Sequence, residues 1–127
     1  MKINHIALYV KDLDRAKEFY KKYFGAIENQ KYHNSKTGLE TYFLSFSGEE
    51  RLEIMTIPQL HENEKNMKQY GYIHLAFSVG SKQKVDDLTY MLKKDGYTVI
   101  SGPRITGDGY YESCCLDSEN NQIEIVE

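Results

Sequence analysis

Two histidines and two glutamates recur in this sequence in matching local contexts. His5 opens the segment HIALYV, and His74 opens HLAFSV 69 residues later. Glu53 lies in the triplet LEI, and Glu124 lies in IEI 71 residues later. Imidazole nitrogens and carboxylate oxygens suit divalent ions such as Ni²⁺, Zn²⁺, Co²⁺, Fe²⁺ and Mn²⁺. The repeat therefore predicts one divalent metal ion per site, which would orient the oxygens of a substrate as a Lewis acid.

Each of these residues has an ordinary structural explanation when it is taken alone. A single histidine on a strand is more often hydrogen-bonded than metal-bound, and a glutamate between apolar residues is usually the solvated side of an alternating strand. Four residues repeated at nearly constant spacing are harder to explain by chance, which favours the metal site. His33 and His61 have no counterpart in the repeat, and we interpret both as surface residues.

The first half predicts a strand, a helix and three further strands. Period-two alternation predicts a strand over 2–10, and an aspartate, Asp12 or Asp14, can cap the helix that follows. Gly25 stands where the helix should end. Further strands are predicted near 27–34, 40–47 and 51–57, separated by the turn-forming segments NSKTG and SGEE.

The second half repeats this order. A strand is predicted over 72–79, then a helix that begins after Ser81 and ends at Gly96, then strands near 97–101, 110–116 and 122–126. The fold class is therefore α+β, with two tandem βαβββ modules at about 1–57 and 72–127 in one domain spanning 1–127. We expect the polar connector 58–71 to be irregular or a short helix.

Strand alternation gives the four polar residues a common side. If the apolar face of each first strand packs on its helix, His5 and His74 lie on the opposite face. Leu52 and Ile54 likewise place Glu53 away from the helix, and the second half does the same for Glu124. Two such curved sheets placed edge to edge would form a cleft lined by the four residues.

The wall of this cleft is also predicted from alternation. Tyr9, Met55 and Ser78 fall on the same faces as the metal residues. The segment 106–112, TGDGYYE, is interpreted as a hairpin turn, with a mobile lid as the alternative. In the lid interpretation, Tyr110 or Tyr111 closes over a ligand.

Composition excludes several classes of function. The chain has 127 residues and a net charge of −3 without a basic tract, which argues against nucleic acid as a partner. No apolar run reaches the ~20 residues of a membrane span, and the N-terminus does not read as a secretion signal. Cys114 and Cys115 are adjacent and so point to opposite faces of a strand, which fits two reduced thiols in a cytoplasmic protein.

The segments HIALYVKDLDRAKEFYKKYFGA, RLEIM, GYIHLAFSV and DSENNQIEIVE together resemble the vicinal oxygen chelate superfamily. That superfamily contains glyoxalase I, extradiol dioxygenases, fosfomycin-resistance enzymes and bleomycin-binding proteins. The resemblance covers essentially the whole chain outside the connector and is strongest to short bacterial glyoxalase I, a lactoylglutathione lyase. It implies the glyoxalase/bleomycin resistance/dihydroxybiphenyl dioxygenase-like fold, a curved mixed sheet around a metal cleft.

The resemblance also implies a reaction and an assembly. His5, Glu53, His74 and Glu124 would bind the metal. Glu124 would act as the base, with Glu53 as the second candidate catalytic carboxylate. The substrate would be a hemithioacetal of an α-oxo-aldehyde and a thiol, isomerised through a metal-bound enediolate. Two chains would pair as a homodimer, with each site shared between them.

The sequence departs from the short bacterial glyoxalases at the end that holds the thiol. Those relatives carry an arginine where this chain has Tyr9 and an asparagine where it has Ile57, and both are expected to bind glutathione. Two alternatives therefore stay open. One is a non-enzymatic protein that binds a small molecule or drug, as bleomycin-resistance proteins do. The other is a fosfomycin-type thiol transferase, for which Glu53 should be dispensable.

Overall fold

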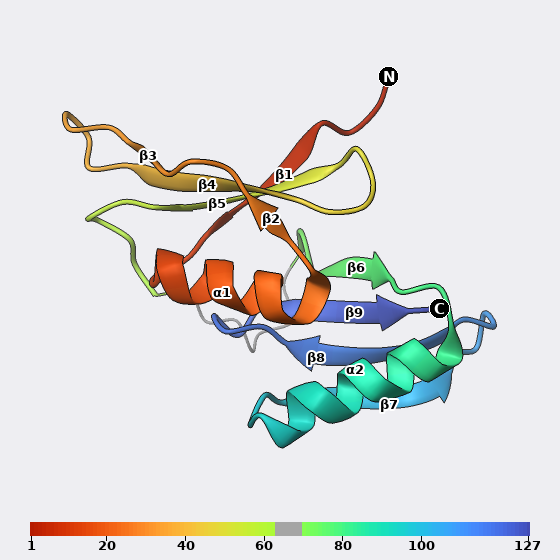
Figure 1. The fold of residues 1–127 in the computed structure, drawn as a ribbon. Helices are drawn as coiled ribbons and strands as arrows, with labels where there is room; N and C mark the ends of the chain where they lie inside the picture. The colour runs from red at the N-terminus through yellow and green to blue at the C-terminus, as the bar shows by residue number, and fades with distance from the viewer. Residues whose placement is uncertain (63–69) are drawn as a thin grey trace. The chain divides into compact units, whose positions relative to one another are not determined.

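The computed structural model describes residues 1–62 and 70–127. The chain divides into two units, Met1–Asn63 and Glu64–Glu127, each with its own sheet and helix (Figure 1). The predicted connector 58–71 contains residues 63–69, so the prediction of its conformation lies largely outside the described residues. In the described parts of the chain, no helix has the length and apolar character needed to cross a membrane.

The first unit is built around one mixed sheet. Its strands run in the order β1-β5-β4-β2, with β3 also on β4, and β1 is parallel to β5 while the other pairs are antiparallel. The elements are β1 (His5–Tyr9), α1 (Leu13–Phe24), β2 (Ile27–Glu28), β3 (Tyr32–His33), β4 (Glu40–Ser45) and β5 (Arg51–Thr56).

The second unit repeats the arrangement with the order β6-β9-β8-β7, in which β6 is parallel to β9. Its elements are β6 (His74–Ser78), α2 (Lys82–Lys94), β7 (Val99–Ile105), β8 (Tyr111–Leu116) and β9 (Gln122–Val126). Two mixed sheets, each accompanied by one helix, confirm the predicted α+β class.

Both helices begin at the predicted caps. The Asp12 carboxylate accepts a hydrogen bond from the Arg15 backbone N–H at 3.0 Å, and the Ser81 hydroxyl accepts one from the Lys84 N–H at 3.3 Å. These bonds satisfy backbone donors that have no partner within the first helical turn. Gly25 ends α1 in the left-handed region, with φ of 64°. At the end of α2, Asp95 is the cap residue and the glycine follows it.

Two predicted strands differ from the observed ones. The strand expected over 27–34 is two short strands, because Asn29 interrupts the pairing with β4. Its side-chain oxygen takes the Phe43 N–H at 2.8 Å, in place of a backbone carbonyl. The strand expected over 97–101 runs from 99 to 105. Gly102 permits this continuation, since its φ is +86° and a Cβ there would lie 2.5 Å from the Glu112 carbonyl oxygen.

The expected packing of each helix on the first strand of its half was wrong. Helix α1 packs mainly on β4 and β5, and α2 packs on β7, β8 and β9. Strands β1 and β6 are the edges of their sheets, so the helices reach the last strand of each half instead. Leu52 and Ile54 are accordingly buried at 3% and 0% exposure, whereas Ile6 of β1 is 38% exposed. The glutamates still face away from the helices, as the alternation predicts.

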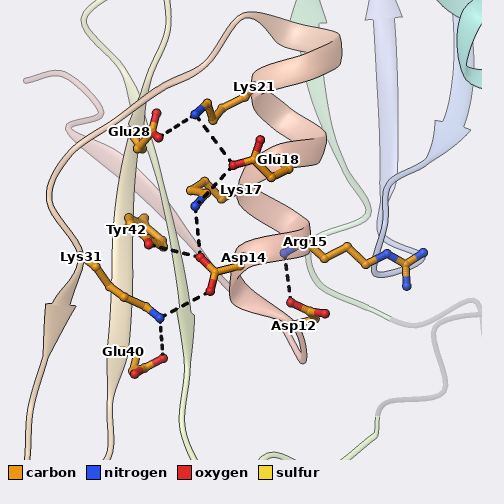
Figure 2. Close-up of polar contacts among 10 residues, drawn as sticks. All are labelled: Asp12, Asp14, Arg15, Lys17, Glu18, Lys21, Glu28, Lys31, Glu40 and Tyr42. Carbon is orange, nitrogen blue, oxygen red and sulfur yellow. Dashed lines mark hydrogen bonds and ion pairs between the residues drawn. The ribbon is translucent and has the colours of Figure 1, made fainter.

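Ion pairs fasten α1 to its sheet on the helix side (Figure 2). The Asp14 carboxylate accepts hydrogen bonds from Lys17 Nζ at 3.1 Å and from the Tyr42 hydroxyl at 3.2 Å. Lys31 Nζ bridges Asp14 at 3.6 Å and Glu40 at 3.0 Å. These contacts lower the pKa of Asp14, chiefly through the bond from Lys17. This network lies on the side of the sheet opposite Glu53, which separates it from the candidate site.

Candidate functional site

His5 and Glu53 form a pair on the face of the first sheet that turns away from α1. The parallel register of β1 and β5 sets Ala7 opposite Glu53, so His5 stands two residues before that position and on the same face. The distance from His5 Nε2 to Glu53 Oε2 is 3.7 Å. The glutamate side chain is 14% exposed and the histidine 40%. A poorly solvated carboxylate beside an imidazole is an arrangement that a cation stabilises.

His74 and Glu124 form the corresponding pair in the second sheet. The parallel register of β6 and β9 sets Ala76 opposite Glu124, with His74 again two residues before it. The distance from His74 Nε2 to Glu124 Oε2 is 3.2 Å, and the side chains are 32% and 20% exposed. The repeat seen in the sequence is thus a repeat of geometry, with the same residue types in the same strand register.

Neighbouring side chains hold the first pair. The Thr41 hydroxyl donates a hydrogen bond to Glu53 Oε1 at 3.1 Å, which leaves Oε2 on the side of His5. The Phe43 ring meets the His5 ring edge-on, with centroids 5.4 Å apart and planes at 88°. Asn4 Oδ1 lies 2.9 Å from His5 Nδ1. Contacts of this type orient ligating side chains in metal proteins.

The second pair has a thiol beside it. Cys114 of β8 lies directly opposite Glu124 in the antiparallel register and is 7% exposed. Burial raises the pKa of the Cys114 thiol, and the charges of Glu124 and Glu112 raise it further, while Arg104 lowers it. A raised pKa favours the neutral form of this thiol.

The donor atoms of each pair fit a divalent metal. Neutral imidazole and carboxylate are the ligand types expected for Ni²⁺, Zn²⁺, Co²⁺, Fe²⁺ or Mn²⁺. Within residues 1–62 and 70–127, no group of three or more His, Cys, Asp and Glu side chains is gathered that could hold an ion. Within each described half, the pair supplies two of these donors, one imidazole and one carboxylate.

Three of the predicted wall residues lie on the same sheet faces as the two His–Glu pairs. Tyr9 shares the face of His5, Met55 that of Glu53 and Ser78 that of His74, since each alternates with the paired residue along its own strand. Tyr9 is 54% exposed and Met55 is partly buried.

Residues 106–110 join β7 to β8 in a hairpin, which is the interpretation that the sequence favoured for the segment 106–112. The Thr106 hydroxyl accepts a hydrogen bond from the Tyr110 N–H at 2.9 Å, and the Thr106 N–H donates to the Tyr110 carbonyl at 2.8 Å. Tyr110 is 59% exposed in this turn. Tyr111 lies on the helix face, where its hydroxyl donates to Asp86 of α2 at 2.7 Å, so the structure does not bring it together with Glu124. The two remaining histidines, His33 and His61, are both exposed, as predicted.

Sequence reasoning missed three neighbours of the two pairs: Asn4, Thr41 and Cys114. Cys114 required the antiparallel register of β8 against β9, which sets it opposite Glu124. Thr41 required the register of β4 against β5, where Phe43 stands opposite Glu53 and Thr41 is the diagonal neighbour. Asn4 required a side-chain conformation, for which the sequence carries no signal.

The chain is similar over almost its full length to an uncharacterized protein of Bacillus subtilis, YqjT. The identity is 28% over 131 residues, covering 98% of this chain and 97% of that protein. The fold matches a crystal structure of a glyoxalase family protein from Enterococcus faecalis with a TM-score of 0.81, at 21% identity and covering 99% and 97% of the two chains.

A second solved structure with this fold is the trypanothione-dependent glyoxalase I of Leishmania major. Its TM-score is 0.79 at 20% identity, covering 100% of this chain and 86% of that one. Residues 2–125 match the family model described as the Glyoxalase/Bleomycin resistance protein/Dioxygenase superfamily.

Proposed function

The chain belongs to the glyoxalase/bleomycin resistance protein/dioxygenase superfamily, and from that membership we propose that it is a divalent-metal-dependent lyase of the glyoxalase I type. The observation that carries the proposal is the pair of His–Glu contacts in identical register, one in each half. Extradiol dioxygenases and fosfomycin-resistance enzymes typically use two histidines and one glutamate. A role for both glutamates therefore favours the glyoxalase reaction.

In this proposal His5, Glu53, His74 and Glu124 hold the ion. The ion supplies Lewis-acid stabilisation of negative charge that develops on substrate oxygens. The substrate is a small α-oxo-aldehyde adduct of a thiol, with a carbon acid next to a carbonyl. Glu124 removes the proton from one carbon and returns it to the neighbouring carbon, which is general acid–base catalysis by one carboxylate.

The surroundings of the two glutamates support different roles. Glu53 has one oxygen engaged by Thr41, so its orientation is fixed as a ligand requires. Among the described residues, no side-chain hydrogen bond is made to Glu124, and its Oε2 lies 3.2 Å from His74 Nε2. A carboxylate with fewer fixed contacts can change its position as it takes up and releases a proton. This difference favours Glu124 as the base.

Two further features of the proposal concern the partners. Two chains form a homodimer in which His5 and Glu53 of one chain complete a site with His74 and Glu124 of the other, an isologous arrangement. The thiol is a low-molecular-weight thiol other than glutathione, since Tyr9 and Ile57 stand where short bacterial glyoxalases carry an arginine and an asparagine.

The experiment combines metal analysis with a thiol screen. Protein purified without added metal or chelator should contain a divalent ion, and methylglyoxal with a suitable thiol should give metal-dependent thioester formation. Weak activity is expected with glutathione. A protein that binds no metal but binds a drug tightly would support the binding-protein alternative. Fosfomycin modification that survives Glu53→Ala would support the thiol transferase.

A further inference from the structure

The residue before the first histidine makes two polar contacts that bear on the metal site. Asn4 Oδ1 accepts a hydrogen bond from Arg51 Nη2 at 2.8 Å and lies 2.9 Å from His5 Nδ1. Arg51 is the residue opposite His5 in the register of β1 and β5. The side chains of His5 in β1 and Arg51 in β5 therefore meet at one oxygen atom of Asn4, the residue before β1.

This oxygen determines which nitrogen of His5 carries the proton. A guanidinium group can only donate hydrogen bonds, so the Asn4 atom that faces Arg51 is the carbonyl oxygen. That oxygen is an acceptor, and the His5 Nδ1 beside it must donate an N–H. In a neutral imidazole the other nitrogen, Nε2, then carries a lone pair.

The lone pair points to the side on which a carboxylate stands. His5 Nε2 is 3.7 Å from Glu53 Oε2, which is too far for a hydrogen bond. Two acceptor atoms thus face each other across a space without a proton between them. A cation bound by both atoms converts this unfavourable contact into a favourable one.

Asn4 and Arg51, together with Phe43, also fix the plane of the His5 ring. The Arg51 guanidinium lies 4.6 Å from the centroid of the Phe43 ring, and that ring meets His5 edge-on. Rotation of the imidazole would break both the contact with Phe43 and the hydrogen bond to Asn4. The position of Nε2 is therefore set before any ion arrives.

The second half has no counterpart of the Asn4 and Arg51 side chains. Ile73 precedes His74 where Asn4 precedes His5, and Gln122 stands opposite His74 where Arg51 stands opposite His5. Within residues 70–127, the side chain of His74 has a polar contact only with Glu124. The group is a property of this chain's first half and does not follow from the internal repeat.

We propose that Asn4, held by Arg51, is a positioning residue that locks His5 in the neutral tautomer protonated at Nδ1 and so prepares Nε2 as a metal ligand. This inference rests on the proposed function, in which His5 binds the ion. Neighbours that orient a ligating histidine typically contribute a factor of about 10 to 100 to metal affinity. Asn4 should contribute on that scale.

The test compares the wild type with Asn4→Leu and Asn4→Asp. Leucine has nearly the same shape and no acceptor, whereas aspartate keeps an acceptor oxygen for both Arg51 and His5. Imidazole ¹⁵N chemical shifts of His5, recorded on chelator-treated protein in mildly alkaline buffer, report the tautomer directly. Titration of the same samples with Zn²⁺ alone reports the affinity. Asn4 is exposed, so the thermal midpoints of the variants should match the wild type.

We expect the Nδ1–H tautomer in the wild type and in Asn4→Asp, and a mixture of tautomers in Asn4→Leu. Zn²⁺ affinity should fall about 10- to 100-fold in Asn4→Leu and stay within a few-fold of wild type in Asn4→Asp. A wild-type His5 protonated at Nε2, or an unchanged tautomer in Asn4→Leu, would overturn the inference. If the wild type shows the Nδ1–H tautomer and yet binds no ion, the proposed metal function fails while the tautomer assignment stands.

Discussion

His5 and Glu53 are held by neighbouring side chains, whereas His74 and Glu124 contact chiefly each other. In the first half, Thr41 binds the carboxylate and Asn4 the imidazole, and the two partners stand 3.7 Å apart. In the second half the partners stand 3.2 Å apart. An internal repeat has thus kept the residue types and register while their neighbours changed. We interpret the first pair as a fixed anchor for the ion and the second as the reactive side.

The largest effect that this comparison predicts is on turnover. Glu124→Gln should lower kcat by about 10²- to 10⁴-fold even at saturating metal, because an amide cannot accept the substrate proton. Glu53→Gln is the matched variant. It should weaken metal binding and keep a much larger share of kcat when metal is saturating. Steady-state kinetics over a metal titration separate the two effects, and equal losses of kcat in both variants would remove the distinction between the halves.

The next prediction concerns how the halves combine. His5→Ala and Glu124→Gln chains should each be inactive alone. When they are mixed and allowed to exchange subunits, half of the dimers are hybrids, and each hybrid has one intact site. Activity should then return to about one quarter of the wild-type level.

The proportion of hybrids can be measured by native mass spectrometry with a tag on one variant. Recovery that scales with this proportion supports sites shared between chains. Hybrid dimers without metal or activity would instead place all four ligands of a site in a single chain.

A smaller effect is expected from the hydroxyl that binds Glu53. Thr41→Val keeps the shape of the side chain and removes its hydrogen bond, so the affinity for Zn²⁺ should weaken by about tenfold. Thr89→Val is the control in the other half, since that buried hydroxyl bonds the Val85 carbonyl and Ser113 on the helix side. It should lower the free energy of unfolding by about 1–2 kcal/mol and leave metal affinity unchanged. Equal affinities for Zn²⁺ in Thr41→Val and the wild type would show that the hydrogen bond from Thr41 to Glu53 does not contribute to metal binding.

The smallest predicted effect is the pH dependence of stability in the second half. Burial raises the pKa of the Cys115 thiol from its ordinary 9.0 to about 11. The unfolded chain therefore loses this proton before the native chain does. The stabilising contribution is complete below pH 9 and is lost as the pH rises toward 11. Urea unfolding at several pH values should show a loss on the order of 1–2 kcal/mol, and Cys115→Ala should lack this component. Identical pH profiles of stability for the wild type and Cys115→Ala would contradict this prediction.

The fold was predictable because its signals are local and repeated. Asp12 and Ser81 mark the helix starts, and the alternation around Glu53 and Glu124 gives their side of the sheet. Packing of the helices was not predictable from these signals. The strand order that makes β1 and β6 edge strands depends on long-range pairing, which local periodicity does not contain.

The candidate site was predictable in its residue types and less so in its surroundings. Strand alternation predicts that each histidine and glutamate share a face, and the parallel pairing of β1 with β5 and of β6 with β9 brings them into contact. Asn4 and Thr41 were missed because their roles depend on which side-chain atoms meet across strands. Tyr111 was predicted to line the pocket because it lies in the segment 106–112. The turn at 106–110 places its side chain on the helix side of β8, where it contacts Asp86.

The most direct test of the central claim is a metal titration of the wild type beside His5→Ala and His74→Ala. Calorimetry with Ni²⁺, Co²⁺, Zn²⁺ and Mn²⁺ should show one tightly bound ion per chain in the wild type. Either histidine substitution should abolish tight binding, because in the proposed site each half supplies one pair of ligands to the same ion. No stoichiometric binding to the wild type, or wild-type affinity in either variant, would contradict this account.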